Sequence, residues 1–268
     1  MAGTATWTPE QLAGWAAGLA DNPPPFGPGQ FRYERAHEWS SAPWNNEPGL
    51  FYEFTRDVET WVPHDYRAEW LQRLGPQTVV RVEGTEKTTE PPQAGWDLRE
   101  PCGNLRELPP IEEPERTEPC DGNGWFWAAS PEFYRSLTGD PQKLYDAIRK
   151  QVTSEFRGND LDFLGKADQL LEPNTPNDFK ATLFEAMSRM PGLVVLDDVM
   201  TADGRNGIGL RFTDTTPWVL DGFTTQWILD RETGDLLETK VTGPGPANES
   251  IVTNTYGVTD QAGVPPAQ

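Results

Sequence analysis

The residues best suited to acid–base or metal chemistry are two histidines, and neither lies in a recognisable catalytic pattern. His37 falls in an aromatic-rich stretch that alternates like a strand, and His64 directly follows Pro63 at the end of the next one. A catalytic or metal-binding histidine usually has histidine, cysteine or carboxylate partners at regular spacing. The chain has neither a His-x-His nor a His-Glu-x-x-His arrangement. We therefore interpret both histidines as structural or surface residues.

Motifs for nucleophilic catalysis and phosphate binding are also missing. The chain has no Gly-x-Ser-x-Gly, no Gly-x-x-x-x-Gly-Lys and no dinucleotide fingerprint. Gly204, Gly207 and Gly209 surround a predicted turn, where the conformational freedom of glycine explains them. We expect a protein that is not an enzyme and uses no cofactor. An enzyme of an unrecognised class is the alternative.

Carboxylates are frequent in one proline-rich stretch, where they raise the question of a calcium site. Glu112, Glu113, Glu115 and Glu118 precede the sequence Asp-Gly-Asn-Gly at 121–124. A calcium loop needs alternating oxygen ligands in a fixed pattern, which this stretch lacks. We interpret it as a solvated acidic loop and expect no metal.

The stretch lies between the two cysteines, Cys102 and Cys120. No second pair accompanies them to complete a zinc site, so we expect a disulfide rather than free thiols. Closing this loop removes about 3 kcal/mol of unfolded-state entropy. A disulfide implies an oxidising, extracytoplasmic compartment. The first residues, however, do not resemble a signal peptide. We therefore expect that a targeting or anchoring segment is missing from this chain.

Aromatic residues are the feature that most favours a binding site, because the chain has 11 Trp. Such side chains can simply fill the space between a sheet and its helices. Alternatively, some of them line an apolar groove for an acyl chain or a hydrophobic peptide. The candidate ligand-binding residues are Trp61, Trp70, Trp125, Phe126, Trp127 and Trp227.

Composition limits the class of protein and its partners. The 268 residues allow one large domain or two small ones. With 22 basic and 42 acidic residues, the net charge is −20, which disfavours nucleic acids and anionic membranes as partners. The chain contains no run of 18 apolar residues, which is the length that a helix needs to span a bilayer.

The hydrophobic periodicity changes from strands to helices and back to strands. A helix begins at Thr8-Pro9, where a capping hydroxyl precedes proline. Further helices are expected after Ser130-Pro131 and Asp140-Pro141, over 161–171 and from 175 to 190. Strands are expected from 30 to 39, over 51–62, 69–74 and 78–83 as a meander, and over 193–199, 208–213, 218–230, 236–242 and 251–258.

This order indicates an α+β fold with one antiparallel sheet and helices packed on one face. The domain organisation expected is an N-terminal helix and linker over 1–27, a single sheet-plus-helices domain over 28–258, and a tail over 259–268. Within the domain, 85–122 is expected to be an irregular excursion closed by the disulfide.

Three stretches are distinctive: NDFKATLFEAM at 177–187 running into MPGLVV at 190–195, DGRNGIGL at 203–210, and ILDRETGDLL at 228–237. Together they resemble an uncharacterised actinobacterial family of single-pass membrane proteins. The strand VETWVP at 58–63 fits the same family. The resemblance covers about residues 28–242, without the excursion between the cysteines, and places a large domain outside the membrane.

The outer domain of this family is similar to the LolA and RseB lipoprotein-binding fold, which implies a curved half-barrel sheet around helices. No catalytic residue follows from the resemblance. The expected function is an extracytoplasmic, envelope-sensing domain of a membrane-anchored protein. Its expected partner is an apolar ligand, a lipoprotein or an extracytoplasmic protein segment. A soluble lipid or lipoprotein carrier is the competing interpretation.

Overall fold

A computed structural model describes residues 6–21, 26–43, 51–83, 94–103, 120, 129–155, 160–213, 222–244 and 248–267. These residues form one antiparallel sheet of 11 strands and five helices. The helices are α1 (Pro9–Leu19), α2 (Pro131–Leu137), α3 (Pro141–Glu155), α4 (Asp160–Gln169) and α5 (Asn177–Met187). The expected α+β class with an antiparallel sheet is confirmed.

The sheet follows the order β1-β7-β8-β9-β10-β11-β2-β3-β4-β6, with β5 added beside β3, and it is not closed into a barrel. Its first half contains β1 (Thr6–Trp7), β7 (Val194–Met200), β8 (Asn206–Thr213), β9 (Thr224–Leu229) and β10 (Leu236–Thr242). Its second half contains β11 (Glu249–Thr259), β2 (Phe31–Pro43), β3 (Phe51–Pro63), β4 (Glu69–Leu74), β5 (Thr78–Glu83) and β6 (Trp96–Pro101).

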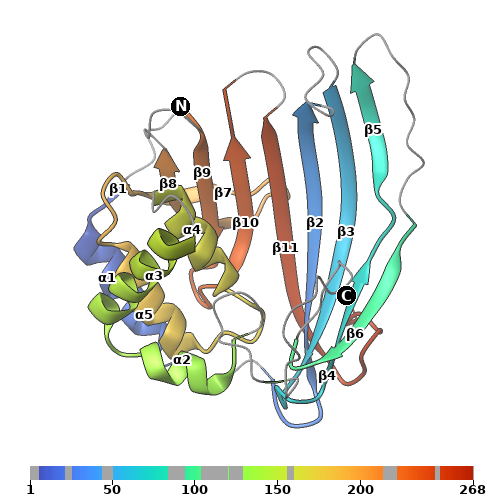
Figure 1. Ribbon diagram of the computed structural model, residues 1–268, viewed down its shortest axis with the longest axis horizontal. Coiled ribbons are helices and arrows are strands. Elements are labelled where there is room, and N and C mark those ends of the chain that lie inside the picture. Colours follow the sequence, from blue (N-terminus) through green and yellow to red (C-terminus); the bar gives the residue numbers. More distant parts are fainter. Residues whose placement is uncertain are drawn as a thin grey trace.

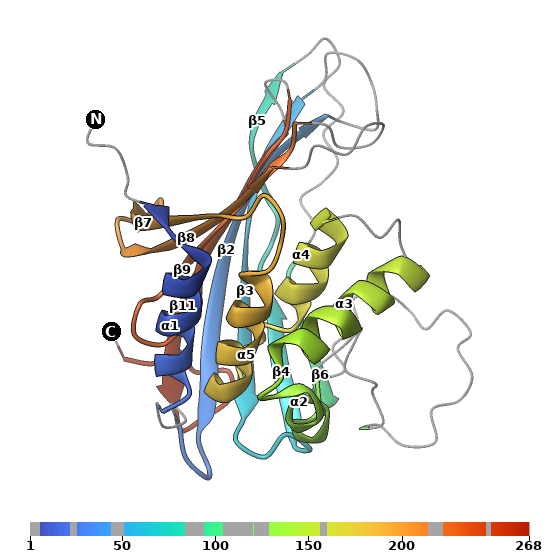
Figure 2. The ribbon, with the colours of Figure 1, turned by 90° about the vertical axis from the view of Figure 1, so that its left-hand side faces the viewer.

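Helices cover one half of this sheet, as Figure 1 shows. The main core lies between them and β7–β10, where Ile208, Trp227 and Leu229 meet the fully buried side chains of α5. Those α5 residues, Phe179, Leu183, Phe184 and Met187, recur at helical spacing, as the sequence predicts. Figure 2 shows α3 and α4 on one side of the sheet that contains the long strands β2 and β3.

Helix α1 belongs to the same core as α5. Thr8 and Gln11 form a capping box at its start, and Leu12, Ala16 and Leu19 are buried in the main cluster. The turn between β9 and β10 supports this packing. A Cβ at Gly234 would lie 2.6 Å from Leu19 Cδ1, and its φ of +67° also favours glycine.

The expected meander is wrong at β5, which pairs with β3 instead of β4. Strand β3 is long enough for two partners: β4 pairs with residues 58–61 and β5 with residues 51–55. Strand β4 ends before Gly75, whose N–H donates to the Asp57 carbonyl on β3 at 2.7 Å. A Cβ on Gly75 would lie 3.0 Å from that same oxygen.

The excursion expected over 85–122 is wrong at 96–101, which form β6. Trp96 and Leu98 are half-buried and alternate with the exposed Asp97 and Arg99, so the strand has the period of two that a sheet needs. Asp97 lies opposite Arg73 on β4, and their side chains form an ion pair at 3.0 Å. The acidic residues at 112–118 and 121–124 lie outside the described residues.

Both predicted hairpins in the last third are confirmed. Strands β7 and β8 join through the turn at 201–205, and β9 and β10 join through 230–235. The Asp230 carboxylate accepts hydrogen bonds at 2.8 Å from the N–H groups of Glu232 and Thr233, which explains the tight second turn. The last strand, β11, pairs along its whole length with β2.

Candidate functional site

A pocket lies at one end of the molecule, between the turn after β3 and the connection from α4 to α5. Its volume is about 390 Å³, within the range of small-molecule sites. The end of β3 and the turn after it contribute Pro63, His64 and Tyr66, and the helical layer contributes residues 173–178. Phe26 and Ala20 close another side. Proline and aromatic surfaces therefore form much of the wall, with a few polar groups between them.

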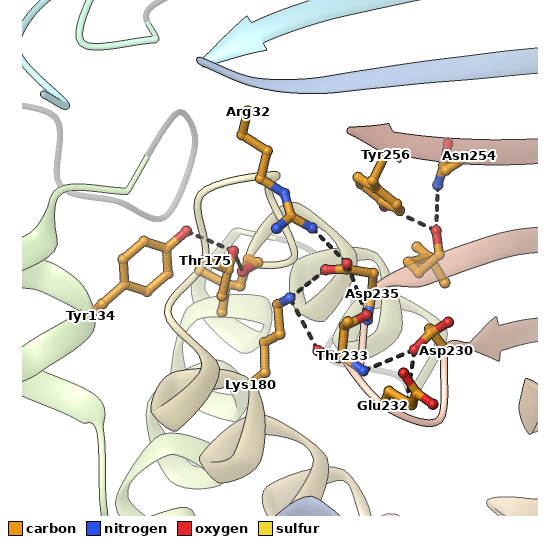
Figure 3. Close-up of polar contacts among 12 residues, drawn as sticks. Arg32, Tyr134, Thr175, Lys180, Asp230, Glu232, Thr233, Asp235, Asn254 and Tyr256 are labelled. Atoms are coloured by element: carbon orange, nitrogen blue, oxygen red, sulfur yellow. Dashed lines mark hydrogen bonds and ion pairs between the residues drawn. The ribbon is translucent and has the colours of Figure 1, made fainter. Parts of the chain in front are cut away.

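Hydrogen bonds fix the helical wall of this pocket. The Thr175 hydroxyl donates to the Leu170 carbonyl at 2.9 Å and lies 3.2 Å from the Tyr134 hydroxyl, which comes from α2 (Figure 3). The connection between α4 and α5 is thus tied to two helices. Beside it, the buried Oδ1 atom of Asn174 accepts no hydrogen bond from the described residues. Such an atom is costly to bury unless a ligand or water supplies a donor.

The opposite wall is held by aromatic contacts. The Phe26 ring meets the edge of His64 at 5.7 Å, and the His64 N–H donates to the Gln30 carbonyl at 3.1 Å. Tyr66 packs edge-to-face on Trp70 at 6.0 Å, and the Trp70 indole N–H donates to the Tyr66 carbonyl at 3.1 Å. Trp70 therefore supports the wall from behind without lining the pocket.

A buried charge cluster lies further inside, between α5 and β2 (Figure 3). The Asp235 carboxylate accepts from Lys180 at 2.5 Å and from Arg32 at 2.6 Å. Burial alone would raise the pKa of Asp235, but the two cations hold it below its ordinary value. Burial lowers the pKa of Lys180, and Asp235 opposes this effect. The cluster joins helix α5, the central helix of the helical layer, to the sheet.

Two half-buried carboxyls lie near this cluster and are easier to protonate than usual. Desolvation raises the pKa of Glu34 to about 7. A hydrogen bond from Tyr256 and the charge of Arg32 lower this pKa but do not offset the effect of burial. Desolvation raises the pKa of Glu172 to about 8, although the Ala129 N–H donates to it at 3.3 Å. The charge of Glu34 adds to the Glu172 shift. The two acids therefore face a common, poorly solvated region between the sheet and the helices.

The two histidines lie in separate surroundings, His64 at the pocket and His37 on β2. His37 lies exposed on the far face of the sheet, with Nδ1 2.8 Å from Asp57, which also pairs with Arg35 at 2.8 Å. His37 and Arg35 border a second cavity of about 450 Å³ together with Asp203. Within the described parts of the chain, no three histidine, cysteine or acidic side chains are placed to hold a metal ion.

The predicted aromatic site is divided among three separate clusters. Trp227 lies in the main core, Trp70 packs with Val62 and Tyr66, and Trp61 packs with Tyr33 and Leu71 on the opposite face of the sheet. All three are almost fully buried. Trp125, Phe126 and Trp127 lie outside the described residues. Ligand binding by these aromatic residues stays a prediction.

The predicted disulfide between Cys102 and Cys120 is present, with Cα atoms 5.3 Å apart. Cys102 is buried against Val62, Tyr66 and Trp70. The cross-link itself therefore lies close to the aromatic wall of the pocket.

Sequence reasoning missed Tyr66, Phe26 and Asn174 as pocket residues. The run Pro-Asn-Thr-Pro-Asn-Asp at 173–178 carried a signal, because two prolines and three helix-capping residue types mark a rigid, polar connection. Tyr66 and Phe26 lie in turns, where no periodicity separates a lining residue from a core residue.

The chain matches no protein-family model and no curated protein. Among the described helices, none is long and apolar enough to cross a membrane.

Proposed function

We propose that this chain is an extracytoplasmic, non-enzymatic binding domain of a membrane-anchored protein, with an envelope-sensing role. The observation that carries the proposal is the pocket of about 390 Å³ between sheet and helices. Apolar walls surround a buried Asn174 oxygen that accepts no hydrogen bond from any described residue. This combination is typical of sites that bind an apolar body and orient it by one hydrogen bond.

The lining favours a neutral or weakly cationic amphipathic ligand. Phe26, Tyr66 and the prolines provide apolar surface. The Asn174 Oδ1 atom can accept a hydrogen bond from a hydroxyl or amide group of the ligand. The exposed Asp178 lines the pocket, and the whole chain carries a net charge of −20. An anionic head group would meet repulsion from both. A hydrophobic segment of a partner protein, with its own amide donors, fits the same description.

The disulfide supports the extracytoplasmic part of the proposal, because such bonds persist in oxidising compartments. The resemblance described above supports the membrane anchor and the envelope role. The architecture is compatible with the LolA and RseB type of binding, in which a curved antiparallel sheet and its helices enclose an apolar ligand.

Titration with the neutral fluorescent probe Nile red tests the pocket, with native mass spectrometry to detect a co-purifying ligand. Ala20→Trp places a large side chain at the pocket wall and is expected to reduce probe affinity at least tenfold. Ala17→Trp is the matched control, because Ala17 is exposed on the same helix and does not line the pocket. Equal affinity in both variants would show that the probe binds elsewhere and would count against the proposed site.

A further inference from the structure

The C-terminal segment 262–267 lies on the face of the sheet that points away from α2, α3 and α4 (Figure 2). On that face, four residues from adjacent strands are directly opposite one another and form a single row. The row is Gly257 on β11, Tyr33 on β2, Trp61 on β3 and Leu71 on β4. The segment crosses the strands along this row.

Residues of the row and the neighbouring Arg73 contact different parts of the segment. The Trp61 indole N–H donates to the Val264 carbonyl at 3.2 Å, and Arg73 Nη1 is 3.5 Å from the Gly263 carbonyl. At the other end, Pro266 fills the space that glycine leaves on β11. A Cβ at Gly257 would lie 2.5 Å from Pro266 Cγ.

The conformation of the segment follows from its prolines. Proline fixes its own φ near −65° and pushes the preceding residue to extended angles. Val264-Pro265-Pro266 therefore favours a polyproline II helix, whose backbone carbonyls have no internal partners. An indole donor between aromatic and apolar side chains is the arrangement by which proteins recognise proline-rich peptides.

The side chains along this row are held in place by the sheet itself. The Tyr33 hydroxyl donates to Glu59 at 2.6 Å, and its ring lies 5.3 Å from that of Trp61. Arg73 stacks over Trp61 at 5.3 Å while it is paired with Asp97. None of these contacts involves the C-terminal segment. The row is therefore preorganised for an extended ligand, which reduces the entropy lost on binding.

We propose that the row Gly257–Tyr33–Trp61–Leu71 is a recognition groove for a proline-rich extended segment of a partner protein. The chain's own segment 262–267 occupies it until such a partner displaces it. Trp61 has no exposed surface beneath the segment, whereas Val264 is 45% exposed. The occupant thus covers the recognition tryptophan but presents much of its own surface to solvent. This proposal is independent of the pocket, which lies on the other face of the sheet.

Displacement is favourable for a partner that binds more tightly than the tethered segment. A short flexible tether gives an effective concentration on the order of millimolar. A peptide with the sequence of residues 262–267 should therefore bind a chain ending at Gln261 at least tenfold more tightly than it binds the full chain.

Fluorescence anisotropy of that labelled peptide tests the proposal, with circular dichroism to confirm folding. A peptide in which alanines replace both prolines is the negative control and should bind at least tenfold more weakly. In the chain ending at Gln261, Gly257→Ala should reduce affinity at least tenfold. Trp61→Phe, which keeps a ring but loses the N–H donor, should reduce it about fivefold.

A full-length variant with Pro265→Ser and Pro266→Ser provides the same test without truncation and should bind like the shortened chain. Equal binding of the proline and alanine peptides by either folded variant would overturn the proposal, as would no binding. A dimer of the full chain that disappears in the chain ending at Gln261 would also overturn it, because a second copy would then be the occupant.

Discussion

Lys180 Nζ lies 2.5 Å from Asp235 Oδ1 in an interior where neither residue is more than 9% exposed. The second Asp235 oxygen accepts from Arg32, so one carboxylate serves two buried cations. Lys180 comes from α5, Arg32 from β2 and Asp235 from the turn before β10. The three residues therefore fix the central helix against strands from both halves of the sheet.

Loss of the shared carboxylate should destabilise the protein more than loss of either cation. Asp235→Asn removes the carboxylate that pairs directly with both buried cations and is expected to cost about 3–5 kcal/mol of unfolding free energy. Lys180→Met leaves the Arg32–Asp235 pair intact, so we expect less than half that cost. Urea denaturation measures both.

Glu132→Gln is the control for these variants. Glu132 pairs with Arg135 on the surface, where both side chains are at least 65% exposed, and such pairs contribute about 0–1 kcal/mol. A larger loss for Lys180→Met than for Asp235→Asn would contradict the assignment of Asp235 as the shared partner.

Stability should fall as the pH rises from about 5 to 8. Glu34 and Glu172 have pKa values of about 7 and about 8 in the folded chain, above their ordinary 4.5. The folded state therefore binds more protons than the unfolded state in this range, and each extra proton contributes at most about 1.4 kcal/mol per pH unit. The salt-bridged Asp57, Asp97 and Asp235 have lowered pKa values and reduce stability only near or below pH 3.8.

The double variant Glu34→Gln and Glu172→Gln should flatten this pH dependence and stabilise the chain at pH 8. Melting temperatures measured at intervals of half a pH unit provide the comparison. An unchanged slope between pH 5 and 8 would show that neither carboxyl titrates in this range.

Reduction of the disulfide should lower the unfolding free energy by about 3 kcal/mol, since Cys102 and Cys120 are 18 residues apart. Mass spectrometry should show a gain of two hydrogens on reduction. The double variant Cys102→Ser and Cys120→Ser should match the reduced protein in thermal denaturation. A variant as stable as the oxidised chain would mean that the cross-link does not restrict the unfolded state.

Local chemistry explains which elements were predictable from the sequence. Thr8-Pro9 and Ser130-Pro131 start helices because a hydroxyl caps the first N–H groups, and both hydroxyls accept such bonds in the structure. The turns at 201–205 and 230–235 follow from their own glycine and aspartate residues. These signals need no information from distant parts of the chain.

Strand order and the pocket depend on contacts between distant segments. Strand β11 pairs with β2 from the opposite end of the chain, and β5 pairs with β3 because β4 covers only part of that strand. Trp61, Trp70 and Trp227 share one residue type but lie in three separate clusters. Aromatic composition therefore predicted burial correctly without indicating which tryptophans are neighbours.

Trp70 should influence ligand binding through Tyr66. Trp70→Phe keeps an aromatic ring but removes the donor to the Tyr66 carbonyl, which we expect to cost about 1–3 kcal/mol of stability. Because Tyr66 is then held less firmly in the pocket wall, we expect the affinity for Nile red to fall about fivefold. Trp227→Phe is the matched control, because Trp227 is equally buried but lies in the main core. If both variants weaken the probe to the same extent, the loss follows from lower stability, and Trp70 has no specific role in shaping the pocket.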